Sequence, residues 1–370
     1  MIREHLTRIT LRPSDDAPAR RRRTTAALAC LVLALAGAAR GGEEAPRERA
    51  SSVSLLAVGD TGKEYALPWL RSGQRSVARG LDHEDRRANV DALLLLGDLF
   101  YPNGLERPEL VDRVRTTLAL PYCRFLRLDG PRSAEIADAC ESALESRHPI
   151  PIHAVPGNHD YNSPESLELE RHAIPDFITN WSMQDGVTRN VELGAGVSLV
   201  LIDSVALIRS GDYAAIRRAV RNARGPWRIV AAHLPVAPGD EAADLEWKSE
   251  VPPIEHFRIP EATVHLYLAG HRHNLQVIEG DLPGPALHVI AGSGSNVRPV
   301  EKRYANRRFA LERSGFARVD LIGHGNDERL HVRLFAMSRY PFAHWAKPRE
   351  VSRWSIDRAG RVREEPITER

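Results

Sequence analysis

Five apolar segments of this chain lead directly into side chains that bind metal ions or carry protons. They are "LLAVG" before Asp60, "LLLLG" before Asp98, "HAVPG" before Asn158 and His159, "IVAA" before His233, and "LYLAG" before His271 and His273. Carboxylate, amide and imidazole groups without cysteine suit iron, zinc or manganese. The set holds more donors than one tetrahedral ion requires. It therefore favours two ions, which could clamp the attacking and leaving oxygens of phosphoryl transfer with Asp98 bridging them.

Each of these residues also has an ordinary interpretation when it is taken alone. A Gly-Asp pair such as Gly97 and Asp98 commonly ends a strand in a surface turn. An isolated pair such as His271 and His273 lies on a surface as often as on a metal. The repetition of such residues at separate strand ends is what favours one common site.

The elements that must position these residues alternate along the sequence. The apolar segments are typical of strands, as are 197–204 and 286–295, and helical patterns occupy 69–81, 134–144 and 212–223. This alternation predicts an α/β fold. Ligands of such folds bind at the carboxyl ends of strands, so we expect the five strand ends to meet at one crevice. Residues 315–337 change to strand-like alternation with a turn at 325–327.

Five short motifs carry a resemblance to a known family. They are "GDTG" at 59–62, "GDLFY" at 97–101, "GNHD" at 157–160, "VAAH" at 230–233 and "GHRH" at 270–273. In this order they resemble the motifs of the purple acid phosphatases, within the calcineurin-like metallophosphoesterases. The resemblance covers about 54–336 and is nearest to the short, tartrate-resistant type. It implies a four-layer α/β sandwich of two mixed β-sheets flanked by helices.

The resemblance also implies a role for each residue of the site. Asp60, Tyr101 and His273 would hold a ferric ion, and Asp98 would bridge to the second metal. Asn158, His233 and His271 would hold that second ion, a divalent Fe, Zn or Mn. His159 would be the catalytic proton donor or charge stabiliser. The implied activity is that of an acid phosphatase, which hydrolyses phosphate monoesters by attack of a metal-bound hydroxide.

Two other functions stay open on the sequence alone. One is a phosphodiesterase or nucleotide pyrophosphatase on the same scaffold, and the other is a non-catalytic exported metal-binding protein. The chain also departs from the family after His233, where another histidine near the substrate phosphate is often found. None follows here until His256, which leaves Asp240 or a water molecule as candidates for that space.

The N-terminus has the pattern of a signal for export. A basic cluster at 20–23 precedes an apolar run at 26–35 and small residues at 36–38. The apolar run is short for a membrane span. The alternative interpretation of this run is a buried helix. We therefore expect a signal peptide at 1–38, a flexible lead-in at 39–50, a metallophosphoesterase domain at 51–337, and a tail at 338–370 with a possible hairpin at "DRAGRV". The mature protein would be periplasmic or secreted.

Composition and cysteine content limit the partners. The 370 residues carry a net charge of +2 with neutral histidines, which gives no argument for nucleic acid or a membrane surface. We expect small phosphorylated substrates, no membrane span after signal removal, and a monomer. Outside the apolar N-terminal run only Cys123 and Cys140 remain. In an exported protein this pair predicts a disulfide, with two buried thiols as the alternative.

Overall fold

The computed structural model describes residues 51–62, 73–236, 252–300, 306–338 and 347–367. By its internal contacts the chain divides into two units, residues 1–47 and 48–370, and every described residue belongs to the second. The predicted signal peptide, the lead-in and Asp240 lie outside the described residues. Among the residues that are described, no helix has the length and apolarity needed to cross a membrane.

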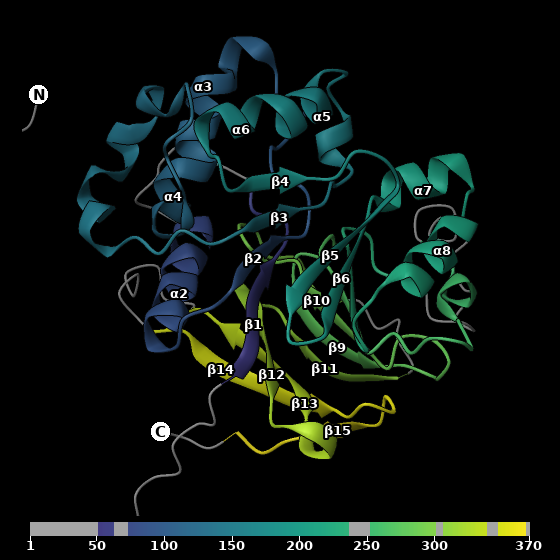
Figure 1. The fold of residues 1–370 in the computed structure, drawn as a ribbon. Helices are drawn as coiled ribbons and strands as arrows, with labels where there is room; N and C mark the ends of the chain where they lie inside the picture. Colours follow the sequence, from purple (N-terminus) through teal and green to yellow (C-terminus); the bar gives the residue numbers. More distant parts are fainter. Residues whose placement is uncertain (1–50, 63–72, 237–251, 301–305, 339–346, 368–370) are drawn as a thin grey trace, which may run out of the picture. The chain divides into compact units, whose positions relative to one another are not determined.

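Two mixed β-sheets form the centre of the described part of the chain (Figure 1). The first has the strand order β15-β14-β13-β12-β1-β2-β3-β4, and the second has the order β11-β9-β10-β8-β7-β6-β5. The strands of the first sheet are β1 (Ser51–Val58), β2 (Ala92–Leu95), β3 (Ile152–Ala154), β4 (Trp181–Met183), β12 (Gly315–Ile322), β13 (Arg329–Ala336), β14 (Arg349–Ile356) and β15 (Val362–Glu364). Those of the second are β5 (Thr188–Gly194), β6 (Val197–Ile202), β7 (Trp227–Ala232), β8 (Leu266–Ala269), β9 (Leu275–Glu279), β10 (Leu287–Ala291) and β11 (Arg307–Leu311).

Helices cover the outer faces of both sheets. The α-helices of the described residues are α2 (Gly73–Arg87), α3 (Leu110–Arg113), α4 (Leu120–Tyr122), α5 (Ser166–Glu168), α6 (Ile174–Phe177), α7 (Ser204–Ser210) and α8 (Ala214–Asn222). Other helical turns are η1 (Arg107–Glu109), η2 (Val114–Ala119), η3 (Cys123–Phe125), η4 (Ser133–Glu135), η5 (Ala137–Ser146), η6 (His159–Tyr161), η7 (Leu169–Ala173), η8 (Ile254–Phe257) and η9 (Gly325–Asp327).

Three apolar clusters fill the spaces between these layers, and the leucine run of β2 shows how. Leu93 and Leu95 belong to the cluster under α2 and its neighbours, whereas Leu94 and Leu96 belong to the cluster between the two sheets. Because successive strand residues point to opposite faces, a strand buried on both faces must be apolar at every position. A third cluster packs α7 and α8 against the second sheet. The predicted four-layer α/β sandwich is confirmed.

The predicted elements differ from the observed ones in instructive places. Residues 212–223 contain α8, and α2 covers the described part of the helix predicted at 69–81 while running further, to Arg87. The helix predicted at 134–144 is confirmed only in part, because the segment is helical but contains no α-helix. That segment forms the 3₁₀ turns η4 and η5, because the backbone leaves the helical region at the buried Ile136 (φ −126°, ψ −2°). The hairpin predicted at "DRAGRV" is confirmed by β14 and β15, but residues 349–364, which were placed in the tail, also extend the first sheet.

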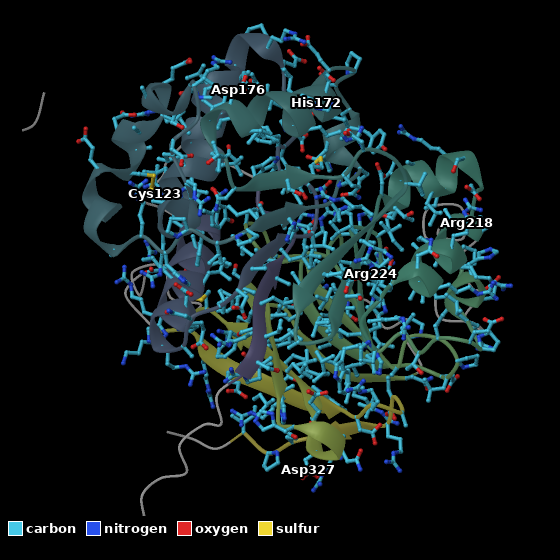
Figure 2. The ribbon with its side chains drawn as sticks, viewed as in Figure 1. Cys123, His172, Asp176, Arg218, Arg224 and Asp327 are labelled. Atoms are coloured by element: carbon cyan, nitrogen blue, oxygen red, sulfur yellow. A yellow bond between two sulfur atoms is a disulfide. The ribbon has the colours of Figure 1, made fainter. Side chains whose placement is uncertain are left out.

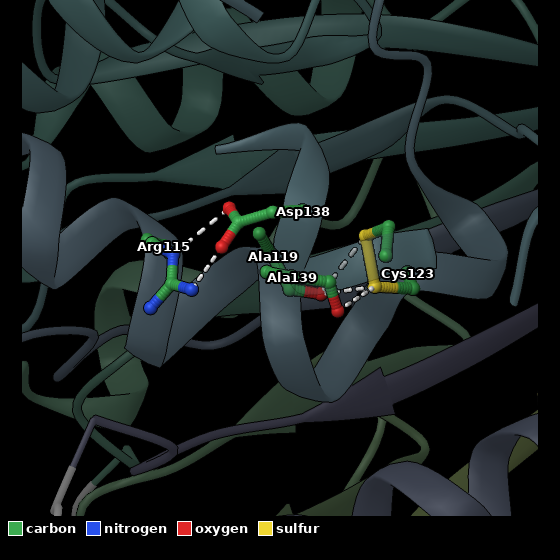
Figure 3. The surroundings of a disulfide bond; sticks show 6 residues. Arg115, Ala119, Cys123, Asp138 and Ala139 are labelled. Atoms are coloured by element: carbon green, nitrogen blue, oxygen red, sulfur yellow. Dashed lines mark hydrogen bonds and ion pairs between the residues drawn. A yellow bond between two sulfur atoms is a disulfide. The ribbon is translucent and has the colours of Figure 1, made fainter. Parts of the chain in front are cut away.

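A disulfide holds the segment between β2 and β3 together (Figure 3). Cys123 and Cys140, whose Cα atoms are 5.4 Å apart, join η3 to η5, and both are buried. Beside the bond, the guanidinium of Arg115 pairs with the Asp138 carboxylate, with Nε 3.0 Å from Oδ1. The predicted disulfide is therefore present, and it braces a segment that packs on the first sheet.

Candidate metal centre

The candidate site lies where parallel strands of both sheets end. In the first sheet Val58 pairs with Leu95, and Leu95 pairs with Ala154, so β1, β2 and β3 end level with one another. In the second sheet β7 and β8 run parallel in the same way. The chain turns out of each strand at its carboxyl end, which brings the following polar residues to one edge. All eight residues named from the sequence lie in this one place.

Two glycines let the loops after β2 and β3 touch. A Cβ on Gly157 would lie 2.2 Å from Oδ1 of Asp98, and one on Gly97 would lie 2.7 Å from the nitrogen of Gly157. Gly97 also has a φ of 82°, which side chains rarely tolerate. The two glycines therefore bring Asp98 and Asn158 within reach of each other.

Backbone strain gathers at the same edge. Five described non-glycine residues have positive φ: Asp60 (57°), Asp98 (54°), His271 (69°), His273 (54°) and, in the turn between β5 and β6, Ala195 (45°). Such conformations cost of order 1–3 kcal/mol each and persist only where the surroundings enforce them. Hydrogen bonds between the loops hold these conformations, as where the N–H of Asp60 donates to the carbonyl of Gly97 at 2.9 Å. Strain of this kind is characteristic of functional sites.

Four of the residues converge on one point, and we call Asp60, Asp98, Tyr101 and His273 the tyrosine cluster. The phenol oxygen of Tyr101 donates to Oδ2 of Asp98 at 2.7 Å and lies 3.0 Å from Oδ1 of Asp60. Nε2 of His273 is 3.1 Å from the phenol oxygen and 3.2 Å from the same Asp60 oxygen. The two carboxylates and His273 are almost completely buried.

The other three donors converge on a second point, and we call Asn158, His233 and His271 the histidine cluster. Oδ1 of Asn158 is 3.0 Å from Nε2 of His233 and 3.1 Å from Nδ1 of His271. These two ring nitrogens are 3.3 Å apart. Oδ1 of Asp98 lies 3.5 Å from Nε2 of His233, so the two oxygens of this one carboxylate face different clusters.

The donor atoms fit a cation at each cluster. Nδ1 of His233 lies 2.8 Å from the carbonyl oxygen of Leu96, which makes Nδ1 the protonated nitrogen of the neutral ring. Nε2 then keeps its lone pair, and this lone pair faces the oxygen of Asn158 and a nitrogen of His271. Acceptor atoms that face one another in a buried site are complementary to a positive ion. The two clusters, joined by Asp98, therefore fit a pair of ions.

The electrostatics of the clusters support the same interpretation. Burial has the largest single influence and would raise the pKa of Asp60, but the charge and hydrogen bond of His273 together with the charges of His233 and His271 outweigh it, and the pKa is lowered. Burial, followed by the neighbouring Asp60 and Asp98, raises the pKa of Tyr101 far above its usual value. The phenol therefore keeps its proton unless a cation displaces it. Burial also holds the pKa of His271 well below 6.5, which keeps the imidazole in the neutral form that binds metals.

His159 stands beside the clusters rather than within them. Its backbone N–H donates to Oδ1 of Asp98 at 2.9 Å, and its ring packs on Tyr101 with 4.4 Å between centroids. Nδ1 lies 2.7 Å from the carbonyl oxygen of Pro102, to which it donates. Among the described residues, Nε2 has no hydrogen-bond partner. The ring is thus oriented by one nitrogen while the other is available for a substrate.

Asp160 has a role that the sequence analysis missed. Its buried carboxylate accepts the N–H groups of Asp98 (2.9 Å), Leu99 (2.9 Å), Phe100 (3.2 Å) and Gly157 (2.8 Å). One side chain therefore ties the loop of Asp98 to the loop of Asn158. The signal was present in "GNHD", where an acid follows the two site residues, but four backbone contacts leave no pattern in a sequence.

His256, the first histidine after His233, stacks on Tyr213 with 4.0 Å between the ring centroids.

Comparisons with known proteins find two acid phosphatases among similar sequences. Tartrate-resistant acid phosphatase type 5 of Sus scrofa is 23% identical over 302 residues, which are 72% of this chain and 79% of that protein. Purple acid phosphatase 3 of Arabidopsis thaliana is 22% identical over 332 residues, which are 82% of this chain and 79% of that protein. The resemblance to purple acid phosphatases is thereby supported at low identity.

A solved structure shares the fold, and a sequence family matches the segment that carries the site. GAP50, the anchor in the inner membrane complex of Plasmodium, superposes with a TM-score of 0.54 at 16% identity, covering 78% of this chain and 85% of that one. At that identity the likeness shows the fold alone. The pattern of the calcineurin-like phosphoesterases matches residues 53–275, which contain every residue of both clusters. The chain belongs to the calcineurin-like phosphoesterase family, and within it resembles the purple acid phosphatases.

Proposed function

We propose that this protein is an acid phosphatase with two metal ions, and that it hydrolyses phosphate monoesters. The observation that carries the proposal is the pair of donor clusters joined through the two oxygens of Asp98. Asp60, Tyr101 and His273 would hold Fe(III), and Asn158, His233 and His271 would hold a divalent Fe, Zn or Mn ion. Tyr101 supports the ferric assignment, because its phenol binds only where a strongly charged ion displaces the proton.

The chain's own residues supply the rest of the chemistry. The ions, when bound, would neutralise the phosphoryl oxygens and make water a stronger nucleophile near neutral pH. Asp98 fixes the distance between the clusters, and the hydrogen bond from its neighbour His159 N–H fixes one of its oxygens. With Nδ1 of His159 committed to Pro102, a protonated ring can give only its Nε2 proton to the leaving oxygen. The alternative function, hydrolysis of phosphate diesters, would use the same side chains on a different substrate.

Export is the second part of the proposal. The signal pattern at 1–38 and the disulfide both support an oxidising compartment outside the cytoplasm, periplasmic or secreted. We expect the exported chain to begin just after Ala38, and N-terminal sequencing of protein recovered outside the cytoplasm would show this. Recovery of that protein with Met1 in place would contradict export by cleavage.

Substitution of His159 tests the catalytic part. His159→Ala should lower turnover by about 10²–10⁴-fold while both ions stay bound, because general acid catalysis contributes about that much. Alkyl phosphates should lose more than 4-nitrophenyl phosphate, whose leaving group needs no proton. His172→Ala is a matched control, since His172 is an exposed histidine with 55% side-chain exposure (Figure 2). Loss of both ions from the His159 variant would refute the assigned role, and faster hydrolysis of bis(4-nitrophenyl) phosphate than of the monoester would favour the diesterase.

A further inference from the structure

A group of side chains beside the histidine cluster is not used by the proposed chemistry. Asp203 follows β6, and Ile202 pairs with Ala232 in the parallel register of β6 and β7, so Asp203 stands next to His233. Tyr161 ends the short turn η6 that begins with His159. Both residues therefore lie at the edge of the sheets that holds the site, on the side of His159.

Hydrogen bonds fix Tyr161 as a platform. Its phenol donates to Oδ2 of Asp203 at 2.6 Å, and Oδ1 of Asp203 accepts the N–H of Ala206 at 2.9 Å, which caps the start of α7. Arg171 approaches the same carboxylate at 3.4 Å. The charge of Asp203 is thus engaged by three donors, and Asp203 itself is buried.

Arg209 lies on this platform. It belongs to the last turn of α7, and its guanidinium carbon is 4.4 Å from the centre of the Tyr161 ring. Stacking of this kind occupies the face of a guanidinium and leaves its five N–H donors free in the plane. Arg209 is exposed, and no carboxylate of the described residues pairs with it. An exposed arginine that rests on an aromatic ring, with no carboxylate partner among the described residues, has donors available to bind a phosphate.

We propose that Arg209, stacked on Tyr161, binds a second phosphate group on the leaving part of the substrate. The inference rests on the proposed function, in which the leaving group faces His159. Tyr161 lies two residues after His159 in the same short turn, and Asp203 follows the strand beside that of His233, so the platform borders the site on the side from which the leaving alcohol would depart. The preferred substrates are then phosphate monoesters whose alcohol part carries another phosphate.

A matched pair of substrates tests this preference. Adenosine 3′,5′-bisphosphate and adenosine 5′-monophosphate differ by the 3′-phosphate, so the ratio of their kcat/KM values for release of the 5′-phosphate measures the contribution of that group. Arg209→Gln should lower this ratio by about tenfold, the size expected for a charge-assisted contact at an exposed arginine. Arg209→Glu should lower it further, because a carboxylate repels the second phosphate.

Arg218→Gln is the matched control, because Arg218 is an exposed arginine on α8 that pairs with Asp212 (Figure 2). It should leave the ratio as in the wild type. An unchanged ratio in Arg209→Gln and Arg209→Glu, with 4-nitrophenyl phosphate still hydrolysed, would overturn this inference and leave the proposed function standing. If the wild-type protein is loaded with metal and still hydrolyses no phosphate monoester, both this inference and the proposed function are overturned.

Discussion

The tyrosine cluster offers a cation two carboxylates, a phenol and one imidazole, whereas the histidine cluster offers two imidazoles, an amide and a single carboxylate oxygen. The first is therefore much the more negative of the two once the phenol loses its proton. A highly charged ion is stabilised where negative charge is concentrated, whereas neutral imidazole ligands are sufficient to bind a divalent ion. The difference implies that the two positions are not interchangeable, although they share Asp98.

The two clusters also differ in how the backbone holds them. Asp60, Asp98 and His273 of the tyrosine cluster all have positive φ, but in the histidine cluster only His271 does. His271 is in turn fixed by its N–H, which donates to Oδ2 of Asp60 at 2.7 Å. The tyrosine cluster is thus the one with the more strained backbone. We expect it to keep its ion more firmly than the histidine cluster does.

Replacement of the shared carboxylate should have the largest effect. Asp98→Asn keeps the shape of the side chain but removes the charge that both clusters use, so both ions should be lost. Activity should fall about 10³-fold or more, because the stabilisation that such ions give the transition state is several kcal/mol. Elemental analysis together with kcat/KM for 4-nitrophenyl phosphate measures both effects. A variant that retains two ions would show that Asp98 does not join the clusters.

Replacement of Asp160 should have an intermediate effect on both clusters at once. Asp160→Asn places an amide NH₂ against backbone N–H groups that need an acceptor, which loosens the loops of Asp98 and Asn158. Supporting contacts of this kind change metal affinity by about 10–100-fold. Melting temperatures at increasing metal concentration would measure the metal affinity, with Asp212→Asn at an exposed carboxylate as the control. Equal affinities in Asp160→Asn and the wild type would refute the positioning role.

Replacement of Tyr101 should have the smallest effect on rate and should separate the clusters. Tyr101→Phe leaves the histidine cluster intact, so the divalent ion stays and activity falls by about tenfold or less. A phenolate on ferric iron gives a visible charge-transfer colour, which the variant should lack. Tyr213→Phe, at a tyrosine that stacks on His256 and belongs to neither cluster, is the control. Wild-type protein that holds iron but is colourless would remove Tyr101 from the set of ligands.

The sequence predicted which residues converge at the strand ends better than it predicted the elements around them, while the roles of those residues stay predictions. Residues such as Asp98 and His271 stand directly after apolar strands, so their type and position are both visible in a single sequence. The edge strands β5 and β11 were not identified, because their mixed exposed and half-buried residues resemble loops. The contacts of Asp160 and of Arg209 join segments distant in sequence, and no local pattern encodes such contacts.

If Asp98 joins two unequal metal positions, a count of metals during stepwise removal should show that the two ions leave separately. Wild-type protein expressed with ample iron would be dialysed against increasing chelator, and metal per chain would be followed by elemental analysis alongside the visible spectrum. We predict two ions per chain, with the first lost before the colour fades and the second lost with it. One ion per chain in fully active protein, or colour and both ions lost in a single step, would show that Asp98 does not join two unequal metal positions.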